Sequence, residues 1–335
     1  MKKRVAINGF GRIGRLLCQI LVKDKDIDIV AINASYTPED LAYLYKYDTI
    51  HGISNDKVTA NDKYLIVNNK KIKIVSNRDA ALLPWKELKI DLVLECTGAY
   101  TNLEDAKKHI IAGAKHVIIS APGKGDMKTI VYGVNEKTLN GKEEVISAAS
   151  CTTNALAPIL KVIDDKIGIE YGYMSTIHAY TNDQVNLDNS HKKGYLSRRG
   201  RACALNIIPT STGAASAIGK VIPSLEGKMQ GNAFRVPVGD GSMLDITVGL
   251  KKNITKEKLN ELLKKNQSKA MKYTDDPIVS SDIIGNPAGG VVDGLLTEVI
   301  ESDGKTIAKI IGWYDNEYGY SMQMARTTRY FLLKK

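Results

Sequence analysis

The stretch GFGRIG at residues 9–14 decides the fold of the first half of the chain. It follows a short β-type run (residues 4–8) and opens a helical pattern, and in that context the spacing G-x-G-x-x-G is a dinucleotide-binding fingerprint. Gly9 permits the tight turn, Gly11 lets the backbone approach a pyrophosphate, and Gly14 lets the helix pack on the strand. The helix N-terminus then offers N–H groups to that anion. We therefore expect a Rossmann-type dinucleotide-binding domain.

The sequence that follows alternates between strand-like and helix-like runs. Apolar runs at residues 27–32 and 91–95 are typical of buried strands, and residues 103–112 have helical spacing. Strands separated by helices predict a mostly parallel sheet. Residues 63–75 differ, because apolar and polar residues alternate there around Asn68-Asn69, which indicates an inserted hairpin.

After about residue 150 the pattern changes to long β-type runs mixed with helices, which predicts a second, α+β domain with a largely antiparallel sheet. The expected fold class is therefore α/β, with a Rossmann-type dinucleotide-binding domain and a second α+β catalytic domain. We expect the domains at residues 1–150 and 151–315, with a C-terminal helix at about 316–335 joining the first. The long polar segment 181–203 has weak periodicity, and such loops inside compact proteins are usually functional. Expected strands lie at 173–179, 233–238, 244–250, 289–300 and 306–313, and expected helices at 155–166, 213–221, 256–266 and 318–333.

Composition places the chain among ordinary globular proteins. Of its 335 residues, 43% are hydrophobic and 25% charged, which argues against disorder, collagen and coiled coil. No run of about 18 apolar residues exists to span a membrane, and Asn8, Arg12 and Arg15 interrupt any signal-peptide core, so we expect a cytoplasmic protein. The net charge of +10 is dispersed, whereas a nucleic-acid binder would concentrate it, so we do not expect nucleic acid as the main partner; attraction of small phosphorylated anions, or solubility, explains the charge as well. The four cysteines lie far apart, so we expect neither a metal site nor a disulfide framework.

The end of the second predicted strand bears on the choice of dinucleotide. A typical NAD fingerprint has Asp or Glu there to bind the ribose 2′-hydroxyl, whereas this chain has Asn33-Ala34-Ser35. The missing carboxylate removes the repulsion that a 2′-phosphate would meet, and Ser35 has a hydroxyl to donate to that phosphate. Alternatively, Asn33 holds the ribose of NAD. This stretch alone leaves NAD and NADP nearly balanced.

A candidate nucleophile, Cys151, stands in Ser150-Cys151-Thr152-Thr153-Asn154, which leads into an apolar helix. A cysteine at a helix N-terminus sits in a positive field, which lowers the pKa of its thiol. His178 ends a β-type run, where a strand would present its side chain into a cleft. However, four cysteines and five histidines make twenty pairs, so spacing alone does not select this one.

Over essentially its whole length, the chain resembles phosphorylating glyceraldehyde-3-phosphate dehydrogenases. Two blocks are highly specific, SCTTN at 150–154 and WYDNE at 313–317. The other matching blocks are INGFGRIGR at 7–15, KYD at 46–48 with HG at 51–52, PTSTGAA at 209–215 and RVP at 235–237. The resemblance also implies a homotetramer, in which residues 181–203 form the family's S-shaped loop near a neighbouring subunit's cofactor.

The resemblance implies a reaction and the residues that perform it. Cys151 is the nucleophile and His178 the base in the reversible oxidation of D-glyceraldehyde 3-phosphate, with inorganic phosphate and NAD or NADP, to 1,3-bisphosphoglycerate. A hemithioacetal and then a thioester form on the cysteine. Thr181, Asp183 and Arg235 match the pocket for the substrate phosphate. The pocket for the attacking phosphate is matched by Ser150, Thr152, Arg199, Thr212 and Gly213, with Arg198 as a rival to Arg199 because the loop is lengthened at 193–197.

The resemblance further implies which residues contact the dinucleotide, and Asn316 matches the one that holds the nicotinamide carboxamide. The chain departs from the common pattern at Ala34, where Asp is usual, and at Ser190, where many NAD-specific members have proline. These departures occur together in members that use NADP, so we expect use of both cofactors, with NADP at least comparable to NAD. The implied cofactor residues are Asn8, Gly9, Gly11, Arg12, Ile13, Gly14, Asn33, Ala34, Ser35, Arg78, Thr97, Ser120, Asn182, Ser190 and Asn316.

Two other functions are compatible with part of this pattern. A related phospho-aldehyde dehydrogenase, such as an erythrose-4-phosphate dehydrogenase, shares the nucleophile and the base, so the motifs discriminate poorly against it. A binding or surface-adhesion protein would keep the fold without catalysis as its main role, and the intact set of Cys151, His178 and Arg235 argues against that reading.

Overall fold

The computed structural model describes residues 1–334, which divide into two compact units. Unit 1 comprises residues 1–150 and the chain from Met324 on, and unit 2 comprises residues 151–323. The C-terminal helix α8 (Tyr318–Leu333) begins in unit 2, and its later turns belong to unit 1. Among the described residues, no helix is both long enough and apolar enough to cross a membrane.

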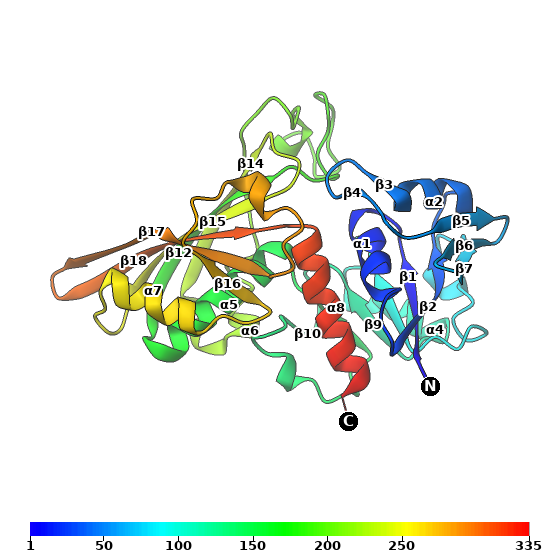
Figure 1. Cartoon of the computed structure of the whole chain (residues 1–335), viewed down its shortest axis with the longest axis horizontal. Coiled ribbons are helices and arrows are strands. Elements are labelled where there is room, and N and C mark those ends of the chain that lie inside the picture. The colour runs from blue at the N-terminus through cyan, green and yellow to red at the C-terminus, as the bar shows by residue number, and fades with distance from the viewer. Residues whose placement is uncertain (335) are drawn as a thin grey trace. The chain divides into compact units, whose positions relative to one another are not determined.

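Unit 1 is built on a nine-stranded sheet in the order β10-β11-β9-β8-β1-β2-β7-β6-β5 (Figure 1). β1 pairs with β2 on one side and β8 on the other, both parallel, so the strand order reverses at β1. This doubly wound arrangement confirms the predicted Rossmann-type domain. The strands are β1 (Lys3–Asn8), β2 (Ile27–Asn33), β5 (Val58–Asn61), β6 (Tyr64–Val67), β7 (Lys70–Val75), β8 (Leu92–Glu95), β9 (His116–Ile119), β10 (Lys128–Thr129) and β11 (Val145–Ser147), with a separate pair β3 (Tyr47–Asp48) and β4 (Gly52–Ile53). The helices are α1 (Arg12–Leu21), α2 (Pro38–Lys46), α3 (Leu103–Ala106) and α4 (Lys108–Ile111).

Glycine sterics explain the turn from β1 into α1. Gly9 has a φ of +92°, and a Cβ at Gly14 would lie 2.1 Å from the Gly9 carbonyl oxygen, so both positions require glycine. The predicted hairpin is also confirmed, because β6 and β7 pair antiparallel across Asn68 and Asn69. The φ values of these two asparagines, 49° and 68°, are those of a type I′ turn.

The central strand β1 is buried on both faces, as expected of a parallel strand covered by helices. Val5 and Ile7 belong to one apolar cluster, which also contains Leu17 of α1 and Phe331 of α8. Ala6, between them in sequence, belongs to a second cluster. Packing on both faces therefore holds the end of β1, and the residues that follow it, in place.

Unit 2 is built on a seven-stranded sheet in the order β13-β14-β12-β15-β18-β17-β16. The pairs β12 with β14 and β16 with β17 are parallel and the other four are antiparallel, which confirms a largely antiparallel sheet. Helices α5 and α7 pack against this sheet (Figure 1). The strands are β12 (Ile169–Ala179), β13 (Ile208–Ser211), β14 (Met229–Val236), β15 (Ser242–Leu250), β16 (Met271–Thr274), β17 (Gly290–Ser302) and β18 (Lys305–Tyr314). The helices are α5 (Cys151–Lys166), α6 (Ile218–Val221) and α7 (Lys256–Lys265).

Two predicted helices differ from their sequence patterns, one because it is divided and one because it is shortened. The helix expected at 103–112 is divided at Lys107 into α3 and α4, because the Ile110 N–H bonds to the Lys107 carbonyl in an i−3 pattern. The helix expected at 213–221 is reduced to α6. There the Ser216 hydroxyl bonds to the Gly213 carbonyl at 3.1 Å, and such local side-chain bonds compete with helix formation.

Candidate active site

The parallel strands of unit 1 end together at one edge of the sheet, where several predicted dinucleotide residues lie. β1 ends at Asn8 and β2 at Asn33, and Thr97 and Ser120 follow the ends of β8 and β9. Gly11 is the N-cap of α1, and a Cβ placed there would meet nothing within 4 Å. A pyrophosphate therefore fits against this helix N-terminus without opposition from a side chain.

A buried network of hydrogen bonds orients the amides at this edge. Asn33 Nδ2 donates to Asn8 Oδ1 (2.6 Å) and to the Asn77 carbonyl (2.8 Å), and Asn33 Oδ1 accepts from the Asn77 N–H (3.0 Å). Asn8 Nδ2 donates in turn to the buried carboxylate of Glu95. Both hydrogens of the Asn33 NH₂ group are thus used within the protein. Its Oδ1 keeps one acceptor position, which suits a ribose hydroxyl.

Arg12 and Ile13 occupy the first turn of α1. The Arg12 guanidinium pairs with Asp48 (Nη2–Oδ1 3.1 Å), in the KYD block that follows α2. Burial opposes ionisation of Asp48, but the bonds from Arg12 and the backbone keep its pKa below the ordinary value. Ile13 is half-buried. The pair ties two of the matched blocks together within unit 1.

Ala34 and Ser35, which are predicted to bear on the choice between NAD and NADP, lie just after β2. Ala34 is half-buried, and its N–H donates to the Val75 carbonyl at 3.0 Å. Ser35 is exposed, so its hydroxyl is accessible to a ligand. Arg78 is also exposed, and its carbonyl accepts a hydrogen bond from the Tyr100 hydroxyl.

The candidate nucleophile and base meet in unit 2. Cys151 is the first residue of α5, and His178 is the last but one of β12. Cys151 Sγ lies 3.4 Å from His178 Nε2, and His178 is only 2% exposed. Folding therefore brings together one of the twenty cysteine–histidine pairs that the sequence leaves open.

Hydrogen bonds to the second ring nitrogen set the tautomer of His178. Its Nδ1 lies 2.7 Å from the Ala179 carbonyl oxygen, which only accepts, so Nδ1 carries the proton. Arg235 Nη1 is also near Nδ1, but its two hydrogens go to the Ala179 carbonyl and the Thr181 hydroxyl, each at 2.9 Å. Nε2 is therefore the acceptor that faces the Cys151 thiol.

The electrostatics of this pair differ from the sequence-based expectation. Burial raises the pKa of the Cys151 thiol, against the opposing effects of Arg235 and Thr152. The predicted lowering considered the helix N-terminus alone, because depth of burial is not visible in the sequence. Burial and the charge of Arg235 lower the pKa of His178 to about 3. The imidazole is therefore neutral in the free protein and able to accept the thiol proton.

Four residues predicted to bind phosphate form one chain of polar contacts. Arg235 bonds to the Thr181 hydroxyl, which donates to Asp183, and Asp183 accepts from Arg199. Within residues 1–334, the buried Nε of Arg235 has no hydrogen-bond partner. Buried donors without a partner are rare in folded proteins, and a phosphate oxygen would satisfy this one.

The two rival arginines, Arg198 and Arg199, lie on the loop at 181–203 and line the same cavity, but they differ in their contacts. The side chain of Arg199 is 16% exposed and pairs with Asp183. Arg198 is exposed and lines a cavity of about 500 Å³ together with Lys193 and Asn232. The contact with Asp183 favours Arg199 over Arg198 as the phosphate-site arginine.

The other residues predicted to bind phosphate or the cofactor lie before α5, after β13 and on the loop at 181–203. Ser150 immediately precedes α5. Thr212 follows β13 and accepts a bond from the Ala214 N–H at 3.1 Å, and Gly213 beside it is exposed. Asn182 and Ser190 are both exposed on the loop.

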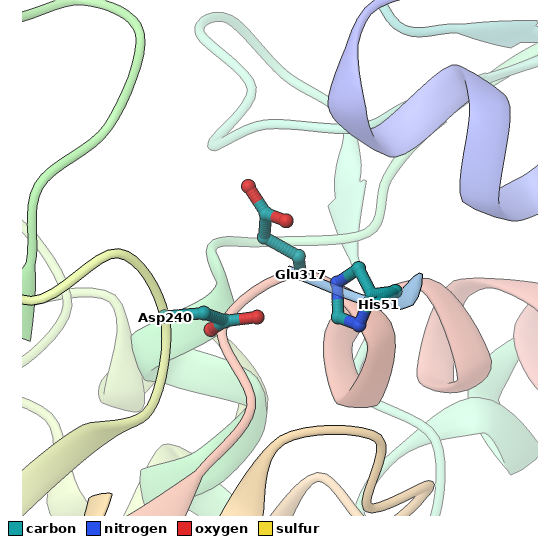
Figure 2. A group of neighbouring side chains, drawn as sticks. All are labelled: His51, Asp240 and Glu317. Carbon is teal, nitrogen blue, oxygen red and sulfur yellow. The ribbon is translucent and has the colours of Figure 1, made fainter. Parts of the chain in front are cut away.

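Asn316, predicted to hold the nicotinamide, is buried between β18 and α8. Its N–H donates to Asp240 Oδ1 (3.1 Å), and its Oδ1 accepts from the Ser242 hydroxyl (2.6 Å). Figure 2 shows Asp240, which precedes β15, and Glu317, which precedes α8. Burial and the nearby carboxylate of Asp315 raise the pKa of Asp240 to about 9. Asn316 is thus held by bonds to both its backbone and its amide.

Several residues at these sites were not singled out from the sequence. The Tyr314 hydroxyl lies 2.7 Å from that of Thr176 and 3.1 Å from that of Thr152, and its ring meets His178 edge-on. In unit 1, Trp85 Nε1 donates to His109 Nδ1 (3.0 Å), so His109 Nε2 donates to Glu95 (3.1 Å). Tyr314 stands inside the WYDNE block, so this motif could have identified it as a candidate site residue. The partners of Glu95 have no local signal, because they come from separate strands and helices.

Comparison with known proteins follows the two-unit division. Residues 3–103 match the family model "Glyceraldehyde 3-phosphate dehydrogenase, NAD binding domain", and residues 150–316 match "Glyceraldehyde 3-phosphate dehydrogenase, C-terminal domain". The chain is 50% identical to a glyceraldehyde-3-phosphate dehydrogenase of Clostridium pasteurianum and 49% identical to that of Clostridium acetobutylicum, over 98% of each chain. It is 50% identical to glyceraldehyde-3-phosphate dehydrogenase 2 of Bacillus subtilis, over 98% of this chain and 97% of the relative. The chain therefore belongs to the glyceraldehyde-3-phosphate dehydrogenase family of oxidoreductases, which have a nicotinamide-dinucleotide-binding Rossmann domain and a catalytic C-terminal domain.

Proposed function

We propose that this protein catalyses the reversible oxidative phosphorylation of D-glyceraldehyde 3-phosphate to 1,3-bisphosphoglycerate, with Cys151 as nucleophile and His178 as base. One observation carries the proposal: the Cys151 thiol lies 3.4 Å from an acceptor nitrogen of a neutral imidazole. Beside it lies Arg235, whose buried Nε is a donor without a partner in the described chain. A nucleophile, a base and an anion donor are what a phosphorylated aldehyde requires.

The chemistry begins with transfer of the Cys151 proton to His178 Nε2 as the sulfur attacks the aldehyde carbon. The imidazolium that forms returns its proton to the alkoxide oxygen, which completes a hemithioacetal. Oxidation of that carbon to a thioester on Cys151 removes a hydride, and a nicotinamide dinucleotide held by the predicted cofactor residues, Asn316 among them, would supply the hydride acceptor. Inorganic phosphate then attacks the thioester carbon, and the C–S bond breaks to release the acyl phosphate. His178 Nε2 accepts the hydroxyl proton as the hydride leaves and returns it to the Cys151 sulfur when the C–S bond breaks, while its Nδ1–H stays bonded to the Ala179 carbonyl.

A direct assay tests the proposal against its rival. The protein should reduce NAD or NADP in the presence of glyceraldehyde 3-phosphate and inorganic phosphate, and it should stop after a single turnover without phosphate, because the thioester persists. Erythrose 4-phosphate should be used at least tenfold less efficiently. Equal or better use of erythrose 4-phosphate would support the related phospho-aldehyde dehydrogenase, and no dinucleotide reduction with either aldehyde would support a binding role.

Arg235→Leu should weaken the use of glyceraldehyde 3-phosphate far more than the use of unphosphorylated glyceraldehyde. Arg235 carries the donor that a substrate phosphate would satisfy, and a charged hydrogen bond contributes roughly 1.5–3 kcal/mol. This corresponds to about one to two decades in the ratio of kcat/KM for the two aldehydes. Arg201→Leu is the matched control, because Arg201 pairs with Asp188 on the exposed loop. Equal losses for both aldehydes would mean that Arg235 acts through His178 and Ala179 alone.

We also propose that the protein uses both NAD and NADP, with NADP at least comparable. Ala34 presents no carboxylate after β2, and the exposed Ser35 hydroxyl can donate to a 2′-phosphate. The Oδ1 of Asn33 accepts from a ribose hydroxyl, which both dinucleotides possess. A second donor would come from Ser190, on the loop of an adjacent subunit. Two neutral hydrogen bonds contribute roughly 1–3 kcal/mol together.

Ala34→Asp should shift the preference toward NAD, because a carboxylate after β2 repels the 2′-phosphate and accepts from the 2′-hydroxyl. We expect the ratio of kcat/KM for NADP to that for NAD to fall by about one to two decades. Ser35→Ala should lower the same ratio by a smaller factor. A wild-type ratio that favours NAD by more than about a hundredfold would contradict the proposed dual use, since two neutral bonds do not offset it.

The proposed assembly is a homotetramer. The loop at 181–203 exposes Leu187, Tyr195 and Leu196, which are apolar side chains that a neighbouring subunit would cover. Light scattering of the purified protein would test the assembly.

We further propose that residues 1–150 with the C-terminal helix form the dinucleotide domain and that residues 151–315 form the catalytic domain. We also propose that the enzyme is cytoplasmic.

A further inference from the structure

We propose that Ser242 is a positioning residue that sets the orientation of the Asn316 amide and, with it, the face of the nicotinamide ring that receives hydride; this rests on the function proposed above and on the contact with the nicotinamide that the family resemblance implies for Asn316. Ser242 is the first residue of β15 and is 0% exposed. Its Oγ accepts a hydrogen bond from the Ala179 N–H (3.0 Å) and donates one to Asn316 Oδ1 (2.6 Å). One hydroxyl thus joins the strand that carries the base to the segment that carries Asn316.

The local backbone explains why a side chain makes this link. The antiparallel ladder between β12 and β15 ends at the pair Ile177 and Met243. Before that pair the chain turns at Gly241, which has a φ of +85° and where a Cβ would lie 2.0 Å from the Ser280 carbonyl oxygen. Ala179 therefore lies past the end of the ladder, and its N–H bonds to the Ser242 hydroxyl instead of a strand carbonyl.

The order of donors fixes the orientation of the Asn316 amide. The Ala179 N–H can only donate, so the Ser242 oxygen accepts from it, and the single hydroxyl hydrogen goes to Asn316. Oδ1 of Asn316 must then face Ser242, and the NH₂ group is turned away. In that orientation the NH₂ group donates to the carboxamide oxygen of a nicotinamide. If the Asn316 amide were rotated by 180°, its oxygen would face the nicotinamide carboxamide instead. That acceptor would favour the nicotinamide ring bound with its opposite face toward the substrate.

The same residue, Ala179, also holds the base. Its carbonyl accepts from His178 Nδ1 (2.7 Å) and from Arg235 (2.9 Å), while its N–H is held by Ser242. Ser242 therefore acts on the base through the backbone of Ala179 and on the cofactor through Asn316. Hydride transfer requires a fixed geometry between the substrate carbon and the nicotinamide ring. The Ser242 hydroxyl contributes to that geometry because it bonds both to Ala179, which holds the base, and to Asn316.

Two measurements on Ser242→Ala test the proposal. The first compares the dissociation constants of NAD and ADP-ribose, which lacks the nicotinamide. We expect NAD binding to weaken about tenfold, the equivalent of one hydrogen bond, with ADP-ribose binding unchanged. The second uses glyceraldehyde 3-phosphate deuterated at the aldehyde carbon. We expect deuterium on one face of the reduced nicotinamide ring in the wild type and on both faces in the variant.

Matched variants separate positioning from a loss of packing. Ser242→Thr keeps the hydroxyl and Ser242→Cys keeps the shape with a weaker donor, so the effects should increase in the order Thr, Cys, Ala; if the alanine variant does not fold, the cysteine variant gives the same comparison. The control Thr306→Val removes another buried hydroxyl, bonded to Asn253, at the opposite end of β15. Equal weakening of NAD and ADP-ribose, or deuterium on one face in every variant, would overturn the proposal. A wild type that binds NAD but oxidises no aldehyde would instead refute the proposed function, and the binding comparison would still decide the role of Ser242.

Discussion

Cys151→Ser should abolish aldehyde oxidation, with kcat/KM reduced by about four orders of magnitude or more, the scale on which catalytic nucleophiles act. A hydroxyl is far less acidic and a weaker nucleophile than a thiol beside the same imidazole, and an oxygen nucleophile forms no thioester. The measurement is the initial rate of dinucleotide reduction with glyceraldehyde 3-phosphate, inorganic phosphate and saturating cofactor. Binding of NAD to the variant should be unchanged, because the cofactor residues remain.

Alkylation provides an independent check on the nucleophile. Iodoacetamide at neutral pH should modify Cys151 before the other three cysteines: burial raises the pKa of this thiol too, but His178 Nε2 lies 3.4 Å away and can take the proton as the sulfur attacks. Cys18 and Cys203 are buried, and burial raises the pKa of Cys18 to about 12. Burial and Glu95 raise the pKa of Cys96 as well. The control Cys203→Ser should retain activity, and modification of Cys203 first with activity untouched would refute the assignment.

His178→Asn should lower kcat by roughly two to four orders of magnitude, the usual scale for general acid–base catalysis. Asparagine is the informative replacement, because its NH₂ group can take the place of Nδ1–H at the Ala179 carbonyl while nothing replaces Nε2 beside the thiol. The variant therefore keeps the local bond and loses the proton acceptor. Rates measured in single turnover, without inorganic phosphate, isolate the hydride-transfer step from the release of the acyl phosphate.

Two observations would distinguish loss of the base from loss of structure. Alkylation of Cys151 at neutral pH should be slower in His178→Asn than in the wild type, since the thiol no longer has an acceptor. His116→Asn should leave both rates unchanged, because His116 bonds to the Glu143 carbonyl within unit 1. A His178→Asn variant with undiminished alkylation and near-normal kcat would mean that another group accepts the proton.

The cofactor-binding fold was readable in the sequence because its signals are local. The turn at Gly9, the close approach of Gly14 to the Gly9 carbonyl and the type I′ turn at Asn68-Asn69 are steric requirements within a few residues. The predicted bounds of α8 also agree with the structure, because helical periodicity is likewise a signal between near neighbours in the chain. The helix expected at 213–221 was wrong over most of its length, because a bond of Ser216 to the backbone competes with helix formation there.

Cys151 and His178 were marked as candidates by their positions at a helix start and a strand end, and motif resemblance supplied the roles now proposed for them. Their contact, in contrast, depends on how α5 packs against the strand β12. The pKa of each group also depends on packing, since burial is the largest cause of both shifts. A sequence shows that a cysteine begins a helix, but not how much water reaches it.

By itself the sequence determined the doubly wound domain, the antiparallel second domain and the membership of one enzyme family. Only the tertiary structure decided which donors and acceptors meet, as in the bond from Ser242 to Asn316, which are 74 positions apart. The physical reason is the range of each interaction. Periodicity and turn sterics act between near neighbours in the chain, whereas the direction of a buried hydrogen bond depends on every partner that packing brings to the same few ångströms.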